Sequence, residues 1–245
     1  GVDLDDWNPA TDRFLPARYS PDDLSGKALC KTALQREFGL PEDASLPLIG
    51  MVSRLAGQKG IEELFSPGYG AAASFCRDMR LQFVVLGSGE AWCEAELRSL
   101  SSRLPNFRAR IGYSEALAHL IEAGSDFFLM PSRYEPCGLN QMYSLRYGTL
   151  PIVRRTGGLA DTVSNYDEKS GTGTGFMLDQ LTPRSVYDTT GWAVWAWYNK
   201  QDHIDAMRGR AMRQEFSWEQ AAREYLSLYE GALGAKRRGS AASEE

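Results

Sequence analysis

Residues 126–141 read DFFLMPSRYEPCGLNQ, and this stretch decides the fold class. Its first part, Asp126–Met130, is a short apolar run of the kind that forms a buried strand. Pro136 biases the residue before it away from helical geometry, and Gly138 relieves crowding in the turn that follows. A helical pattern then begins and continues over 139–147. The stretch therefore predicts a strand, a stiff turn and the start of a helix.

The same alternation of strand and helix repeats along the chain. Five further apolar runs are strand candidates, at 48–52, 81–86, 107–111, 150–153 and 175–178. Helical patterns lie at about 70–80, 90–103, 114–123, 139–147 and 183–199. This order predicts a parallel sheet covered by helices on both faces, with ligands bound at the carboxyl ends of the strands.

The flanking regions differ from this central pattern. Residues 1–45 read as a loop with one helix near 27–38, and 183–231 carry two or three helices without strands between them. The aromatic residues crowded into this second region favour packing, although a sugar-stacking platform is the alternative. We expect one domain over 1–231 and a disordered tail over 232–245.

Composition excludes several classes of protein. The 245 residues carry a net charge of −5, which argues against a nucleic-acid-binding surface. No apolar run approaches the roughly 20 residues of a membrane span, and no signal-peptide pattern is present. The four cysteines form no CxxC pair, and no cysteine–histidine cluster has zinc spacing. The chain begins with Gly1, so we expect its natural N-terminus to lie upstream.

Two cations follow the first predicted strand. Arg54 and Lys59 stand five residues apart in the glycine-containing segment SRLAGQKG at 53–60. Fixed positive charges at a strand-to-helix loop suit a diphosphate. The alternative is that both are ordinary solvated surface residues.

Two other strand ends carry candidate binding groups. Glu135 lies on the stiff turn after 126–130, where its carboxylate can accept hydrogen bonds from sugar hydroxyls, or can simply cap a helix. Gly157 and Gly158 follow 150–153 and allow backbone amides to approach a ligand, or form a plain loop. The pair does not match the phosphate-binding P-loop pattern. Residues 87–92 do not match the dinucleotide-binding pattern either, because they lack its third glycine.

These segments, taken together and in order, resemble the C-terminal domain of bacterial glycogen synthases and plant starch synthases. The matching stretches are SRLxxQKG, IGY, PSRYEPCGLNQ and YGTLPIVRRTGGLADTV, at 53–60, 111–113, 131–141 and 147–163. GVDxxxWNPxTD at 1–12 and FSW at 216–218 also match.

The resemblance implies a fold, a reaction and a substrate. The fold is a Rossmann-like parallel sheet with helices on both faces, one half of a GT-B glycosyltransferase, followed by C-terminal helices. The reaction is the retaining transfer of glucose from ADP-glucose to the non-reducing end of an α-1,4-glucan, with no metal and no cofactor. Asp3-Leu4-Asp5 has the Asp-x-Asp form of some metal-dependent glycosyltransferases, but its position in an irregular opening loop argues against a metal site.

The resemblance also implies roles for individual residues. Arg54 and Lys59 would bind the diphosphate and stabilise the charge on the leaving ADP. Glu135 would contact the donor glucose, and Tyr113 would stack on adenine. The backbone amides of four residues at the start of the next helix would hold sugar hydroxyls and the distal phosphate; these are Cys137, Gly138, Leu139 and Asn140. Three residues after the fifth strand would line the site; these are Thr156, Gly157 and Gly158.

Two departures from the wider GT-B class qualify the resemblance. Tyr143 stands where many members carry a second glutamate, which glycogen and starch synthases also lack. The N-terminal domain of the family, which supplies much of the acceptor surface, is missing. The alternatives are therefore an inactive nucleotide-sugar-binding module and a GT-B transferase that uses UDP-glucose.

We expect a cytoplasmic protein if the source is bacterial, and a plastid stroma protein if it is a plant or alga.

Overall fold

The computed structural model describes residues 1–241, with side chains described as far as Leu233. Its centre is one parallel sheet in the order β3-β2-β1-β4-β5-β6. The strands are β1 (Leu48–Leu55), β2 (Gln82–Gly89), β3 (Phe107–Ile111), β4 (Phe127–Met130), β5 (Leu150–Arg154) and β6 (Phe176–Leu178). This is the doubly wound Rossmann order, and all six predicted strands are confirmed.

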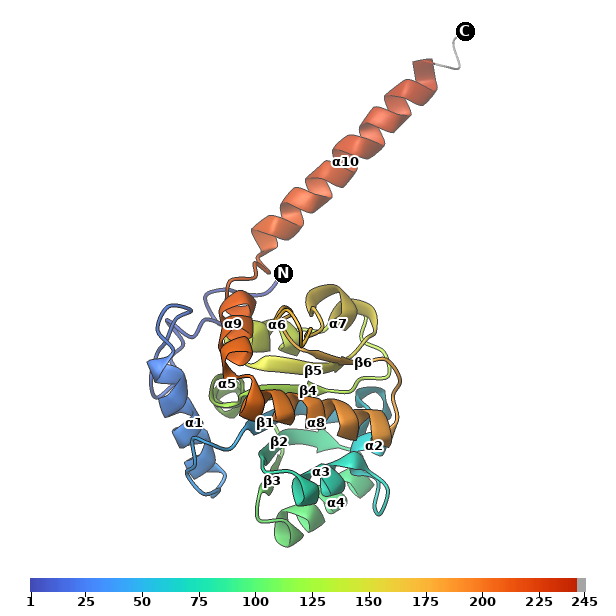
Figure 1. The fold of residues 1–245 in the computed structure, drawn as a ribbon. Helices are drawn as coiled ribbons and strands as arrows, with labels where there is room; N and C mark the ends of the chain where they lie inside the picture. Colours follow the sequence, from blue (N-terminus) through green and yellow to red (C-terminus); the bar gives the residue numbers. More distant parts are fainter. Residues whose placement is uncertain (242–245) are drawn as a thin grey trace.

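Helices cover both faces of the sheet (Figure 1). On one face α2 packs against α4, and α3 packs against α8; on the other, α5 packs against α1 and α6, and α6 against α9. Their bounds are α1 (Ser25–Glu37), α2 (Ile61–Phe65), α3 (Ala71–Asp78), α4 (Ala91–Arg103), α5 (Glu115–Gly124), α6 (Asn140–Arg146), α7 (Gly157–Thr162), α8 (Pro183–Asn199) and α9 (Gln201–Met212). A short 3-10 turn, Gly57–Lys59, precedes α2.

The core explains why the strands read as continuous apolar runs. Strands β1, β2, β4 and β5 are covered on both faces, so consecutive side chains are buried. Phe83 of β2 contacts Phe107 edge to face, with 5.3 Å between ring centroids, and Phe75 of α3 at 5.4 Å. This cluster holds the helices of that face on the sheet.

The opening segment is fastened to α5 and α6 by an aromatic stack. The ring of Trp7 lies between those of His119 and Tyr143, with 3.8 Å to each centroid. Deeper in, Asp12 accepts hydrogen bonds from Tyr147 (2.6 Å) and from Nδ1 of His119 (2.8 Å). Burial by itself raises the pKa of Asp12, but the hydrogen bonds from His119 and Tyr147 outweigh it and lower the pKa.

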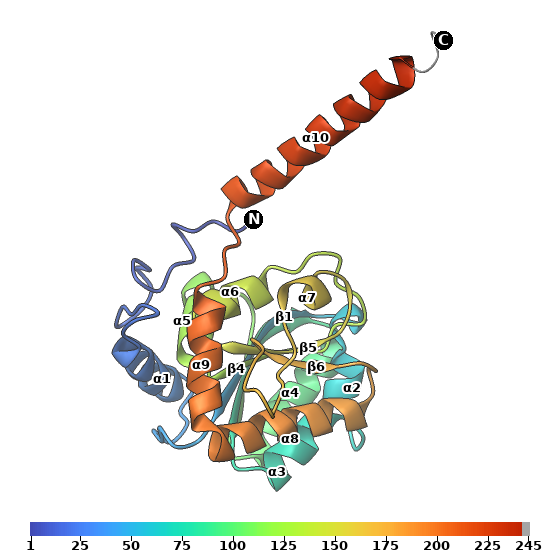
Figure 2. The same ribbon diagram turned by 45° about the horizontal axis from the view of Figure 1, so that its top comes forward.

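The C-terminal helices correct two expectations. Helix α10 (Trp218–Ala241) continues through 232–241, where the sequence predicted disorder, because alanine, leucine and basic residues there favour a helix; residues 242–245 lie outside the described residues. Trp192 and Trp197 pack against the core as expected. Helix α10 instead projects away from the body (Figures 1 and 2), so that Tyr225 and Tyr229 are exposed.

The sheet order also fixes where a ligand can bind. β1 lies between β2 and β4, so the connections leave the sheet in opposite directions on either side of β1 and β4. This switch point opens a crevice at the carboxyl ends of the two strands. Arg54 lies at the carboxyl end of β1, Lys59 in the segment after β1, and Glu135 in the segment after β4.

Candidate functional site

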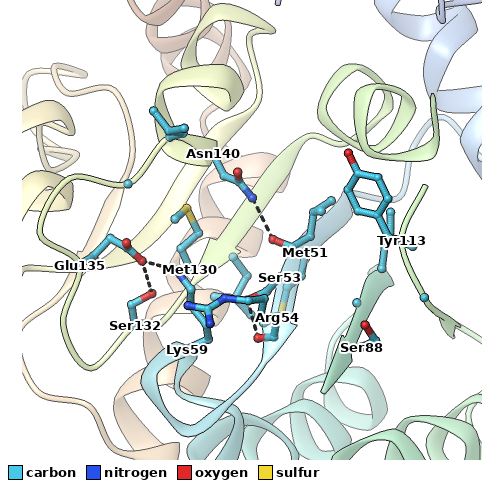
Figure 3. A pocket seen from close by; sticks show the side chains of 17 residues that line it. Met51, Ser53, Arg54, Lys59, Ser88, Tyr113, Met130, Ser132, Glu135 and Asn140 are labelled. Carbon is cyan, nitrogen blue, oxygen red and sulfur yellow. Dashed lines mark hydrogen bonds and ion pairs between the residues drawn. The ribbon is translucent and has the colours of Figure 1, made fainter. Parts of the chain in front are cut away.

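A pocket of about 320 Å³ lies at the carboxyl ends of β1, β2 and β4 (Figure 3). It brings together seven of the predicted site residues, from segments far apart in the sequence: Arg54, Lys59, Tyr113, Glu135, Gly138, Leu139 and Asn140. Residues that the sequence reasoning missed complete the wall, namely Met51, Val52, Ser53, Leu86, Gly87, Ser88, Gly112, Leu129, Met130 and Ser132.

The floor of the pocket is an ion pair between Lys59 and Glu135. The ammonium group follows β1 and the carboxylate follows β4, and both are largely buried. Ser132 Oγ also donates to Glu135 Oε2, over 3.3 Å. Glu135 is therefore held by partners on its own turn and on the neighbouring loop (Figure 3).

The Lys59 loop is held against the end of β4 by backbone geometry. Gly60 adopts a φ of 74°, and a Cβ there would lie 2.1 Å from the carbonyl oxygen of Pro131. Only glycine permits both this conformation and this approach. Arg133 strengthens the contact, because its Nε donates to the carbonyl of Gly57 (3.1 Å) and its N–H to that of Gln58 (2.8 Å).

Arg133 also links the Lys59 loop to the start of α2. Its guanidinium pairs with Glu62 and Glu63, at 2.6 Å each. Those carboxylates neutralise Arg133, which is not among the residues that line the pocket. Arg133 is thus a positioning residue. It belongs to the PSRYEPCGLNQ stretch at 131–141, but the sequence did not indicate this role.

Arg54 is the pocket cation without a carboxylate partner among the described residues. Its side chain is exposed, and its recorded contact is with Gln58 Oε1, at 3.2 Å. With Lys59 already paired to Glu135, the charge left over in the pocket is that of Arg54. The pocket is therefore prepared for an anionic group beside a hydroxyl-bearing one.

Two further residues define the ends of the pocket. Tyr113, at 86 % exposure, stands at the rim and is free to stack on a planar ring. Asn140 at the start of α6 donates from Nδ2 to the carbonyl of Val52, 2.9 Å away, and so ties α6 to β1. Ser88, exposed near the carboxyl end of β2, adds a hydroxyl that carried no recognisable signal in the sequence.

The glycine pair occupies a different place from the one expected. Neither Cys137 nor any of Thr156, Gly157 and Gly158 belongs to the described lining of the pocket. Instead a Cβ on Gly158 would lie 1.9 Å from the carbonyl oxygen of Cys137, and the Gly158 N–H donates to the carbonyl of Glu135, over 2.9 Å. The pair supports the Glu135 turn from behind, because residues with a Cβ would push that turn outward.

The described residues hold no metal-type cluster in the pocket. The group of three potential ligands found among them is Asp6, Glu115 and His119, and none of these lines the pocket. Asp3, in the Asp-x-Asp stretch, accepts from the N–H groups of Asp5 (2.9 Å) and Asp6 (3.1 Å) and so shapes a turn.

A family model matches the whole of the sheet. The model of glycosyl transferases group 1 matches residues 34–187, which include β1 to β6 and the pocket. No helix among the described residues combines the length and apolar character needed to cross a membrane.

Several curated relatives are glycogen synthases. The chain is 63 % identical over 236 residues to a glycogen synthase of Treponema denticola, covering 96 % of this chain and 48 % of the relative. It is 52 % identical over 234 residues to glycogen synthase 1 of Geobacter metallireducens, covering 95 % and 46 %. The chain therefore spans about half the length of the curated relatives it matches.

A solved structure extends the comparison to the fold. The catalytic domain of starch synthase IV from Arabidopsis thaliana, solved bound to ADP and acarbose, superposes with a TM-score of 0.84 at 33 % identity. The match covers 96 % of this chain and 48 % of that one. The predicted fold, one half of a GT-B glycosyltransferase, is confirmed.

Proposed function

Because the chain belongs to the glycosyl transferases group 1 family, we propose that it is the donor-binding half of an α-1,4-glucan synthase. The donor is ADP-glucose, and glucose is transferred with retention to the non-reducing end of the glucan. The observation that carries this proposal is the pocket at the switch point, in which Arg54, Lys59 and Glu135 converge from two strand ends.

The charges of the pocket suggest how the donor lies. The diphosphate sits beside Arg54, whose guanidinium can fork across two phosphate oxygens. The glucose lies toward Glu135, whose carboxylate accepts hydrogen bonds from sugar hydroxyls. Adenine stacks on Tyr113 at the rim, which is exposed enough to meet a ring without rearrangement of the core. The starch synthase that superposes on this chain was solved bound to ADP, which supports this choice of nucleotide.

The bond that breaks joins the glucose to the diphosphate, and negative charge grows on the departing ADP. Arg54 stabilises that charge more strongly in the transition state than in the bound donor. Lys59 is shared between Glu135 and the phosphate when the donor is present. No metal and no cofactor is part of the proposal, because two side-chain cations supply the positive charge.

The acceptor site requires a second domain. The relatives are about twice as long as the matched region, which supports a missing half that faces this pocket. Exposed apolar side chains on α10 are suited to packing against such a half; they are Trp218, Tyr225, Leu226, Leu228, Tyr229 and Leu233. The bacterial relatives also support a cytoplasmic location.

The start of the chain supports the same arrangement. The Val2 N–H donates to the carbonyl of Phe216, 2.8 Å away, so the opening segment and the start of α10 lie side by side (Figure 1). A second half that packs on α10 would therefore also lie beside the opening segment.

Two measurements test the proposal. Calorimetry should show that ADP binds this chain and that UDP competes poorly. Incubation with radiolabelled ADP-glucose and glycogen should give no incorporation by the chain alone, because one wall of the cleft is missing and the acceptor is not oriented. UDP binding at least as tight as ADP would overturn the donor, and incorporation by the chain alone would overturn the need for the second half.

A further inference from the structure

A second group of polar side chains lies where the opening segment meets the start of α5. Asp6, Glu115 and His119 each place one potential ligand atom within 4.8 Å of the other two. Both carboxylates are exposed, whereas the imidazole is fully buried. None of the three lines the donor pocket, so the proposed glucosyl transfer does not use them.

The imidazole is oriented as in a metal site. His119 Nδ1 lies 2.8 Å from Asp12 Oδ2, which also accepts from the hydroxyl of Tyr147. Because that oxygen is an acceptor, Nδ1 carries the hydrogen and Nε2 carries the lone pair. Nε2 is buried and has no hydrogen-bond partner in the described part of the chain. A carboxylate that holds the other ring nitrogen is the usual support of a metal-bound histidine.

The ring is also fixed in place. Trp7 stacks on His119 with 3.8 Å between ring centroids and an interplanar angle of 14°. The ring of Phe14 also packs against His119, with 4.8 Å between ring centroids. A ligand that cannot rotate loses little conformational entropy when an ion binds. The unpartnered nitrogen is thus held rigidly next to two exposed carboxylates.

The surroundings favour a cation. A surface hollow of about 420 Å³ is lined by four aspartates and a single basic residue, together with Thr11: Asp3, Asp5, Asp6, Asp12 and Arg13. Glu115 adds a further carboxylate beside Asp6. This excess of negative charge lowers the free energy of a bound cation.

We propose that Asp6, Glu115 and His119 bind one divalent first-row transition-metal ion, through Nε2 and one oxygen of each carboxylate. A set of one imidazole and two carboxylates suits Zn²⁺ or Mn²⁺ better than Mg²⁺ or Ca²⁺, which prefer oxygen alone. The ion joins the opening segment to the first residue of α5, Glu115, which lies two residues after Tyr113. It is structural, and water completes its coordination on the exposed side.

The test is a calorimetric titration of the full chain with ZnCl₂ after treatment with a chelator. The exposed thiol of Cys137 is replaced by serine in every sample, because it would compete for zinc. One saturable site is expected. Glu115→Gln and Asp6→Asn should each weaken it at least tenfold, and both positions are exposed, so the fold is kept. Asp5→Asn, a neighbouring exposed carboxylate outside the three ligands, should bind within twofold of the parent.

Nuclear magnetic resonance of the imidazoles identifies the ligand directly. The chain has two histidines, His119 and His203, so the signals are readily assigned. Zinc should shift the Nε2 signal of His119 and leave His203, which is bonded to Tyr166, unchanged. Absence of saturable binding, unchanged affinity in Glu115→Gln, or a shift confined to His203 would each overturn the proposal.

Discussion

Lys59 and Glu135, 76 residues apart in sequence, form a largely buried ion pair that joins the loop after β1 to the turn after β4. Each charge compensates the other in the unliganded chain. A donor phosphate that attracts Lys59 therefore competes with Glu135 for it. The two residues act as one unit, although the sequence assigned them to different parts of the donor.

Removing Lys59 alone should cost stability as well as affinity. Lys59→Ala leaves the carboxylate of Glu135 buried with Ser132 as its remaining hydrogen-bond donor, which costs about 1–3 kcal/mol. Urea unfolding of the ligand-free chain measures this loss. The double variant Lys59→Ala/Glu135→Gln should regain most of it, because no buried charge remains.

Donor binding separates the two roles of the pair. The double variant should remain poor in ADP binding, since the phosphate has lost a cation. If it unfolds like the parent and also binds ADP like the parent, Lys59 serves the fold alone. A double variant no more stable than Lys59→Ala would mean that the unpaired carboxylate of Glu135 is not what destabilises the single variant.

Arg54→Ala should affect binding and spare the fold. The side chain is exposed and its recorded contact is with Gln58, so the unfolding midpoint should stay within experimental error. Loss of charge-assisted hydrogen bonds of about 1.5–3 kcal/mol should weaken ADP binding by roughly 10- to 150-fold. Arg98→Ala on α4, where the arginine pairs with Glu94, is the matched control and should bind ADP normally.

Tyr113→Ala tests the site of the base. Because the tyrosine is 86 % exposed, its removal creates no core cavity. Stacking contributes about 0.5–1.5 kcal/mol, so ADP affinity should fall roughly 2- to 12-fold. Inorganic pyrophosphate, which lacks a base, should bind both proteins equally, and a parallel loss of pyrophosphate affinity would contradict the assignment.

The sequence predicted the sheet because each strand is a local pattern. The run at 126–130 needs no distant partner to be recognised, and β4 follows it closely. The pairing of Lys59 with Glu135 is different in kind, since it depends on β1 and β4 being neighbours in the sheet. Alternation of strands and helices fixes a parallel sheet, but it leaves the order of the strands open.

Gly157 and Gly158 illustrate the same limit. A glycine pair after a strand indicates close backbone approach, and the structure has that approach at both residues. The signal does not say what approaches. Here the neighbour is the backbone of 135–137, a segment 20 residues earlier, and only the fold could identify it.

Gly158→Ala should therefore disturb the Glu135 turn, although Gly158 itself does not line the pocket. The added Cβ would lie 1.9 Å from the carbonyl oxygen of Cys137, which is backbone and cannot rotate away. Strain of about 1–3 kcal/mol is expected, together with weaker ADP binding. Gly231→Ala on α10 is the control, because a Cβ added there would meet nothing within 4 Å apart from the backbone of its own helix. Unchanged unfolding and binding in Gly158→Ala would show that the turn can shift freely.

Asp126, at the start of β4, predicts how the fold responds to acid. It pairs with Lys31 (2.7 Å) and Arg208 (2.5 Å) in the interior. Burial alone raises the pKa of Asp126, but the two cations outweigh it and hold the pKa below its ordinary value of 3.8. The unfolded chain thus binds the proton more tightly, so the stabilisation is complete above about pH 4 and is lost as pH falls through the folded pKa.

Asp126→Asn removes this contribution and leaves two cations buried without their carboxylate, which costs about 3–5 kcal/mol at neutral pH. Urea unfolding of both proteins between pH 3 and pH 7 measures the effect. The difference in unfolding free energy should shrink as pH falls below about 4, because the parent then loses the stabilisation from the charged Asp126, which the variant lacks at every pH. Other titrating groups, such as Asp12, are common to both proteins and cancel in this difference. A difference that stays constant down to pH 3 would mean that the pKa of Asp126 is the same in the folded and unfolded chains, and that its ion pairs therefore contribute nothing.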